Sequence, residues 1–202
     1  NNESFVKIIQ KDPDSLSTIM ICTKDRANVF ATIIGILDSE NINFLDAKLF
    51  GMKNGFCLDF ITISNQAGEV ISKHTSIAKS LTIRLKEALD QEILSPKIVK
   101  RRQPKHLKHF NTDTIIKYKH DMTHRWTEID IKTSDRPGLL ASICQVFLDH
   151  GALIRKARIA TYGERAEDKF CITSKENTPY LKKKDLERLI NDMSVSLSGA
   201  NK

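Results

Sequence analysis

The chain has 202 residues and a formal net charge of +7. This length suits two small domains of roughly 100 residues, each of which can bury its own core. The hydrophobic content of 40% is ordinary for a globular protein, and no apolar run approaches the ~18 residues that span a bilayer. With no signal peptide in view, we expect a cytoplasmic protein without a membrane partner. The start at Asn1 rather than Met suggests a segment of a longer protein.

The first half of the chain predicts a short series of strands and helices, from alternating and helical spacing of apolar residues. In order, these are a leading strand (4–11), a strand (18–23), a helix that begins near Val29, two strands (43–52 and 56–63) and a helix with an apolar stripe of Ile77, Leu81, Leu85, Ala88 and Leu89.

The second half repeats this series at a constant shift of 110 positions. Thr133-Ser-Asp-Arg-Pro-Gly follows the second copy's strand, as Thr23-Lys-Asp-Arg follows the first copy's. Strands are predicted at 114–120, 127–133, 152–161 and 168–173. Helices are predicted from Leu139 to a glycine stop at Gly151 and over Leu186–Met193. Val195-Ser-Leu197 is too weak for a trailing strand, so the leading strand should fill that edge of the sheet.

The predicted fold class is therefore α+β, with two tandem domains of one kind. Each should have an antiparallel sheet with both helices on one face. Duplicated domains favour binding or regulation over catalysis, because catalytic machinery is rarely kept in two adjacent copies. We place the first domain at 1–103 and the second at 113–202.

The junction between the copies carries the whole net charge, since nine basic and two acidic residues lie between Lys97 and Arg125. Residues 104–112 are predicted to be a basic linker that repels itself into an extended form. A docking surface for another domain, or for nucleic acid, is the alternative.

The loop after the first strand of each copy holds the candidate ligand residues. Asp25 and Asp135 are plausible helix caps, and Pro137 fits a first helical turn. A helix N-terminus also offers free N–H groups that can bind a carboxylate. The same aspartates could therefore cap a helix, hold a ligand, or do both.

The motif Asp135-Arg-Pro-Gly-Leu-Leu-Ala141, between a strand and an amphipathic helix, resembles the ACT domain family. With Lys156-Ala-Arg-Ile-Ala-Thr161 and Gly163-Glu-Arg-Ala-Glu-Asp168, it is similar to the C-terminal tandem ACT region of bacterial PII uridylyltransferase/uridylyl-removing enzymes. The resemblance implies two ferredoxin-like ACT domains that sense glutamine. It also implies upstream catalytic domains in a longer parent enzyme. The PII signalling protein would be a partner of that enzyme, and Mg²⁺ would be its metal. This segment itself is predicted to contain no catalytic residue, cofactor or metal site.

Within that resemblance, the two copies divide the features of an amino-acid site. The second keeps Asp135 and Gly138, with Arg136 and Leu139 beside them, and the first keeps Asn43 near Asp46. We therefore expect one composite site between the repeats, with Asp25 and Asn28 as the first copy's equivalents of the loop residues. The alternative is that neither copy binds a ligand here. A homodimer through the ACT sheets is a further implication.

Three other readings remain open. The chain could be a stand-alone ACT regulator in transcription or signalling. Lys53-Asn-Gly-Phe-Cys-Leu-Asp-Phe60 loosely matches an RNA-binding signature, although the first strand lacks the partner aromatic ring. His106/His109 and His120/His124 have spacings a metal could use, but solvated histidines are expected. The four cysteines form no Cys-x-x-Cys pair and are expected to be buried free thiols.

Overall fold

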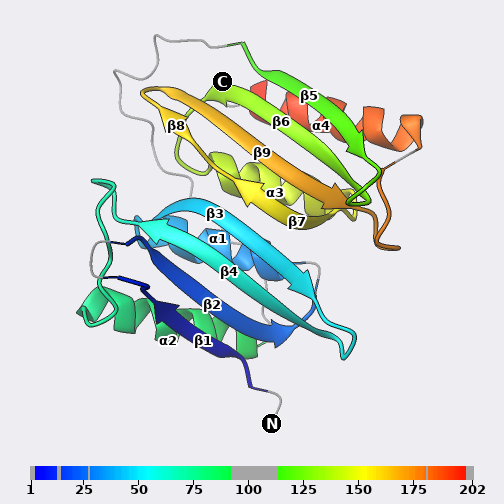
Figure 1. The fold of residues 1–202 in the computed structure, drawn as a ribbon. Coiled ribbons are helices and arrows are strands. Elements are labelled where there is room, and N and C mark those ends of the chain that lie inside the picture. The colour runs from blue at the N-terminus through cyan, green and yellow to red at the C-terminus, as the bar shows by residue number, and fades with distance from the viewer. Residues whose placement is uncertain (1–2, 13–14, 27, 92–112, 181, 199–202) are drawn as a thin grey trace. The chain divides into compact units, whose positions relative to one another are not determined.

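The computed structural model describes residues 3–12, 15–26, 28–91, 113–180 and 182–198. The chain divides into two compact units, residues 1–97 and 98–202, each with its own sheet and core (Figure 1). The predicted linker at 104–112, and the predicted boundary at residue 103, lie outside the described residues.

The first unit contains four strands and two helices. In chain order these are β1 (Phe5–Ile9), β2 (Ser17–Lys24), α1 (Val29–Ser39), β3 (Asn43–Gly51), β4 (Phe56–Ser64) and α2 (Ser76–Asp90). The strand order across its sheet is β1-β2-β4-β3, and all neighbours are antiparallel. Both helices cover one face of this sheet (Figure 1).

The second unit repeats the plan with one short additional strand. Its elements are β5 (Ile115–Asp121), β6 (Trp126–Ser134), α3 (Leu139–Asp149), β7 (Leu153–Arg158), β8 (Thr161–Tyr162), β9 (Arg165–Thr173) and α4 (Lys183–Ser198). The order is β5-β6-β9-β7, with β8 paired to β9. Each unit thus has the ferredoxin-like arrangement expected of an ACT domain, and the predicted fold class is confirmed.

Side-chain alternation along the central strands places the core between sheet and helices. In β2 the odd positions from Ser17 to Thr23 are buried, and Ile19 and Ile21 are fully so. Phe147 and Phe170 meet edge to face in the second core, with ring centroids 5.1 Å apart. These helix-facing positions are what an alternating apolar pattern predicts.

The leading strands occupy the sheet edge that was predicted for them. β1 pairs antiparallel with β2, and β5 pairs antiparallel with β6. In both units a hydrogen bond of 2.8 Å between two hydroxyl groups holds the start of the leading segment. It joins Ser4 and Thr23 in the first unit, and Thr114 and Thr133 in the second. The same contact at a shift of 110 residues shows that the duplication extends to individual hydrogen bonds.

The first helix of each unit ends in the same way. Gly151 has a φ of 64° after α3, and Asn41 has a φ of 57° after α1. In both cases the next residue's N–H donates to the carbonyl five residues earlier, Ala152 to Phe147 and Ile42 to Leu37. This is the Schellman motif, so the glycine stop predicted at Gly151 is confirmed.

Two expectations about the second helices differ from the structure. Ile77 is 56% exposed, and Ala78 takes its place on the buried stripe with Leu81, Leu85 and Leu89. The helix begins one residue earlier than the stripe alone suggests, because Thr75 caps it by accepting from the Ala78 N–H. Val195–Leu197 is not a strand remnant but the last turn of α4.

Candidate functional site

The loop between β6 and α3 is a tight turn rather than the first turn of a helix. The Leu139 N–H donates to the Arg136 carbonyl, and Gly138 has φ 76° and ψ 6°. With Pro137 at the second position, these values define a type II turn. The prediction that Pro137 lies in the helix is therefore wrong, because α3 starts at Leu139 with Gly138 as its N-cap.

The predicted helix-capping role of the loop aspartates is also wrong. The N-cap residues are Asn28 for α1 and Gly138 for α3, and neither cap has a side-chain hydrogen bond. Asp25 and Asp135 lie three residues earlier, where their backbone N–H groups donate to the carbonyls of Gly55 and Glu164. The half-buried Asp135 carboxylate is thus left outside the helix, and burial raises its pKa.

The first unit's loop differs in its backbone. The Val29 N–H donates to the Arg26 carbonyl, but Asn28 has φ −101°, which any residue adopts. Asn28 therefore occupies the position equivalent to Gly138 but does not adopt the left-handed conformation of that glycine. The two loops are equivalent in position, but their backbones differ at the residue before the helix.

The arginine that follows each loop aspartate donates hydrogen bonds to the C-terminal end of the second helix in its own unit. Arg136 donates from Nη1 to the Leu197 carbonyl (3.1 Å) and from Nη2 to the Ser196 carbonyl (3.2 Å), in the last turn of α4. Arg26 does the same for α2, through the Leu89 carbonyl (2.6 Å). A cation at a helix C-terminus satisfies carbonyls that have no partner within the helix and complements the helix dipole. The Arg136 guanidinium, one of the predicted ligand groups, is engaged in this contact.

Behind each loop, a buried aspartate stands on the helix-facing side of the sheet. Asp168 of β9 and Asp59 of β4 each keep 3% of their surface exposed, at the same position in their strands. Burial, and then the charge of Asp135, raise the pKa of Asp168 to about 7, while a backbone hydrogen bond from Ala160 acts against this. Neither residue was predicted to bind a ligand, although Asp168 ends one of the motifs on which the family resemblance rests. The sequence did offer one sign of them: in each strand, apolar and polar residues alternate, and an aspartate stands at a position where the alternation predicts a core residue.

The two buried aspartates have different neighbours on their own strands. In the first unit the Cys57 thiol donates to Asp59 Oδ2 at 3.7 Å. Burial, and then Asp59, raise the pKa of Cys57 to about 12, so the thiol keeps its proton. In the second unit Ala166 stands where Cys57 stands in the first, two residues before the aspartate. Asp168 instead accepts a hydrogen bond from the backbone N–H of Ala160, and its Oδ1 atom has no partner among the described residues.

Asn43 and Asp46 lie elsewhere in the first unit. Asn43 begins β3, pairs with Ser64 and donates to the Asn65 carbonyl at 2.7 Å. The Asp25 loop is at the opposite end of that sheet, where Lys24 pairs with Phe56. Asp46 follows a β-bulge, as Lys156 does in the second unit. The structure thus brings Asp135, Gly138 and Leu139 into one loop, but it separates Asn43 from Asp25 and Asn28. The composite site between repeats stays a prediction.

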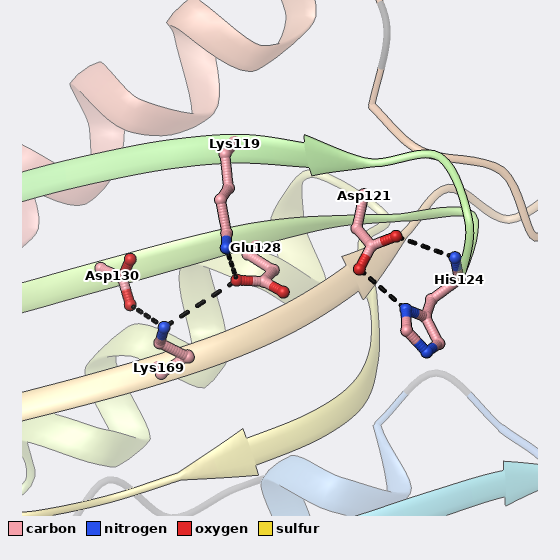
Figure 2. A network of polar contacts seen from close by, with 6 residues as sticks. All are labelled: Lys119, Asp121, His124, Glu128, Asp130 and Lys169. Atoms are coloured by element: carbon pink, nitrogen blue, oxygen red, sulfur yellow. Dashed lines mark hydrogen bonds and ion pairs between the residues drawn. The ribbon is translucent and has the colours of Figure 1, made fainter.

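The outer face of the second sheet carries ion pairs between neighbouring strands (Figure 2). Lys119 contacts Glu128 at 3.0 Å, and Lys169 contacts Asp130 at 3.1 Å and Glu128 at 3.9 Å. These pairs join residues that are opposite each other or diagonal on neighbouring strands. Exposed pairs of this kind contribute little to stability, and this face resembles an ordinary solvated surface.

The predicted histidine pairs divide between described and undescribed residues. His106 and His109 lie outside the described residues. His124 closes the β5–β6 turn, where its backbone N–H and then its ring lower the pKa of Asp121 (Figure 2). His120 contacts the Thr127 hydroxyl at 3.0 Å. Within residues 3–91 and 113–198, gaps aside, no group of three or more His, Cys, Asp and Glu could hold a metal ion.

The cysteines are free, as predicted. Three of them are buried, whereas Cys22 is half-buried because it points to the outer face of the first sheet. Among the described helices, none is both long and apolar enough to cross a membrane.

Comparison with known proteins finds similarity to one family of bacterial enzymes. No protein-family model matches it. It is 38% identical over 155 residues to the bifunctional uridylyltransferase/uridylyl-removing enzyme of Psychrobacter sp. (strain PRwf-1), covering 77% of this chain and 17% of that protein. The enzyme so named in Vibrio campbellii (strain ATCC BAA-1116) is 31% identical over 203 residues, covering 96% and 23%. The chain matches a C-terminal segment of this enzyme family.

The match extends across both units. The relative from Pseudomonas fluorescens (strain SBW25) is 33% identical over 186 residues, or 92% of this chain and 21% of its own length. The chain thus spans about a fifth of the length of these uridylyltransferase/uridylyl-removing enzymes. Among solved structures, that of a putative glycine cleavage system transcriptional repressor aligns over 90% of both chains at 13% identity, with a TM-score of 0.31.

Proposed function

We propose that this chain is the amino-acid-sensing part of a uridylyltransferase/uridylyl-removing enzyme, and that its ligand is glutamine. The observation that carries the proposal is the match of both units to a C-terminal segment of that family at 31–38% identity. A duplicated fold agrees with a regulatory role, because neither copy needs its own catalytic machinery.

The loop between β6 and α3 supports an amino-acid ligand. Beyond Leu139, whose N–H donates to the Arg136 carbonyl, the N–H groups of the first turn of α3 have no acceptor within the helix and can bind a carboxylate. Asp135 stands beside them, outside the helix, where it can accept from an ammonium group. A free amino acid carries both groups on one carbon atom, so this loop suits its recognition.

Under this proposal the parent enzyme is cytoplasmic, and its catalytic domains lie upstream and use Mg²⁺. The bound amino acid would shift the parent enzyme between adding UMP to the PII protein and removing it. The ligand must then bind more tightly to one of the enzyme's two states, since equal affinity for both shifts nothing.

Calorimetry tests the proposal directly. The purified chain is titrated with L-glutamine, and with L-glutamate and the other amino acids as controls. We expect saturable binding of glutamine and at least tenfold weaker binding of glutamate. A folded chain that gives no heat with millimolar glutamine would contradict the proposal. A gel shift with RNA at physiological salt tests the RNA-binding alternative, and the chain alone is expected to transfer no UMP.

A further inference from the structure

The sheet of the first unit has an apolar outer face, on the side opposite α1 and α2 (Figure 1). Strand register places one apolar residue from each strand in a single row, in the order Phe5, Cys22, Leu58 and Phe50. The neighbouring rows continue this surface with Met20 and Phe60 on one side, and with Phe56 and Met52 on the other. All eight side chains are half-buried or exposed. These eight residues form the apolar patch, and contiguous patches of this kind mark interaction surfaces.

The same face of the second unit is charged, although its strands pair in the same register. In place of Met20, Cys22, Leu58 and Phe60, the second unit has Asp130, Lys132, Glu167 and Lys169. These charges neutralise one another across the strands, with Lys132 3.2 Å from Glu167 and Lys169 3.1 Å from Asp130. An apolar outer face is therefore no requirement of this fold. The first unit has a surface that water covers poorly, and it calls for a partner.

Three lysines border the apolar patch. Lys7 and Lys48 lie at the two ends of the Met20–Phe60 row, and Lys24 pairs with Phe56. The ion pairs of the described residues include none of these lysines. Within strands β1 to β4, Asp46 is the one acid on this face. An apolar centre with a mostly basic rim complements a partner surface that is apolar at its centre and acidic at its edge.

The size of the apolar patch favours a tethered partner over a second copy of the chain. Four strands at ~4.8 Å spacing and three rows ~7 Å apart give an area of roughly 400 Å². A stable complex of separate proteins buries ~800 Å² on each side, whereas a tethered surface acts at a millimolar effective concentration and needs less. A symmetric dimer through this face would also bring the lysine rim against itself.

The family match indicates where a tethered partner comes from. In the uridylyltransferase/uridylyl-removing enzymes the matched segment is C-terminal and makes up about a fifth of the length, so most of the enzyme precedes it. Phe5, at one end of the central row, is on the first strand of this chain. The apolar patch thus reaches the side of the first unit where the preceding part of such an enzyme connects.

We propose that the apolar patch docks the first unit on the part of the parent enzyme that precedes this chain. This inference rests on the proposed parent enzyme, and not on glutamine as the ligand. The partner is a surface of the same polypeptide, apolar at its centre and acidic at its edge. The first unit then holds the chain on the enzyme, while the second unit carries the candidate ligand loop.

Cys22 lies in the central row and reports whether the apolar patch is covered. It is half-buried in this chain, whereas the other three cysteines are buried. Its alkylation by N-ethylmaleimide is followed by mass spectrometry, in the chain alone and in the full-length parent enzyme. We expect alkylation about tenfold slower in the full-length enzyme, because a covered thiol reacts only when the interface opens.

Two variants of the full-length enzyme, each with a matched control, test the apolar centre and the basic rim separately. Phe50→Asp should restore fast alkylation of Cys22, and Ile115→Asp should not. Phe50 and Ile115 are similarly exposed, at 51% and 47%, but Ile115 lies on the charged face. Lys7→Glu should also speed alkylation, whereas Lys117→Glu, at the equivalent position of the second unit, should not. Circular dichroism confirms that each variant is folded.

Four results would overturn the inference. The first is equal alkylation of Cys22 in the chain and in the enzyme. The second is faster alkylation in the chain alone when Phe50→Asp is introduced, which means that the chain covers its own patch. The third is alkylation of the chain that speeds up on dilution, which means that a second copy covers it. The fourth is protection of Cys22 by single-stranded RNA, whose bases stack on exposed aromatic rings.

The glutamine titration is independent of this test. Protection of Cys22 in the enzyme without glutamine binding to the chain leaves docking in place and contradicts glutamine sensing. Glutamine binding without protection has the opposite meaning. A full-length gene that encodes no preceding catalytic domains overturns the inference together with the proposed parent enzyme.

Discussion

At the scale of single residues, Asp59 and Asp168 break the apolar pattern of the strands that contain them. Each has core residues as its neighbours on the helix-facing side, such as Phe170 beside Asp168. A core position that accepts an acid at a cost in stability is a candidate for function, because stability is commonly traded for activity at such sites. The cost can be measured through its dependence on pH.

Asp168→Asn should stabilise the ligand-free chain near neutral pH. Between about pH 4 and pH 7 the folded protein keeps a proton on Asp168 that an unfolded aspartate has already released, so the free energy of unfolding falls as pH rises through this range. Asparagine cannot ionise, so the variant does not lose this free energy of unfolding as pH rises. We expect a gain of roughly 2–4 kcal/mol at pH 8 and almost none at pH 4. Urea unfolding at both pH values measures the difference. A gain of equal size at both would show that ionisation is not its cause.

At the scale of elements, each unit ties the end of its second helix to the loop after its first full strand. The contact from Arg136 to the last turn of α4 joins residues that are 60 and 61 positions apart. Arg26 makes the corresponding contact with α2 in the first unit. The loop that we propose for ligand binding is therefore held on one side by a long helix.

Arg136→Met should destabilise the second unit by about 1–2 kcal/mol, because two carbonyls at the end of α4 lose a charged donor. Arg136→Lys should recover part of this, since one ammonium group cannot reproduce both guanidinium bonds. Hydrogen exchange is expected to speed up in the last turn of α4 and not in its first. Lys184→Met, an exposed site at the other end of α4, is the control and should change little. Unchanged exchange in Arg136→Met would refute the capping role.

The type II turn before α3 makes a separate prediction. Gly138→Ala should cost about 1–2 kcal/mol, because alanine is strained at a φ of 76°. Asn28→Gly in the first unit should bring no stabilisation, since Asn28 already has a negative φ. Thermal melts of the two variants give the comparison. A stabilising Asn28→Gly would mean that the two loops share one conformation after all.

At the scale of the whole molecule, the two units share a fold but differ on their outer sheet faces. The second unit's outer face carries ion pairs, whereas Phe5 and Phe50 are about half exposed on the first, at 49% and 51%. Phe50 meets Phe60 edge to face at 6.3 Å. The predicted homodimer through the sheets stays a prediction.

The units should fold independently of each other, since each has a complete sheet, two helices and its own core. Residues 1–97 and 113–202, expressed separately, are expected to give cooperative urea transitions and native-like circular dichroism. A domain of this size has a thin margin of stability, so the separate units are compared at low temperature. Either half remaining unfolded would show that its core depends on the other.

The sequence by itself determined the duplication, the order of the elements, the edge position of the leading strands and the location of the candidate loop. These follow from local periodicity and turn chemistry, which act over a few residues. The tertiary structure alone decided that Asp168 is buried where the charge of Asp135 acts on it, that Pro137 lies in a turn ahead of the helix, and that Arg26 and Arg136 reach the ends of α2 and α4. Each of these depends on strand register and on packing between segments far apart in the chain, and no local pattern encodes such contacts.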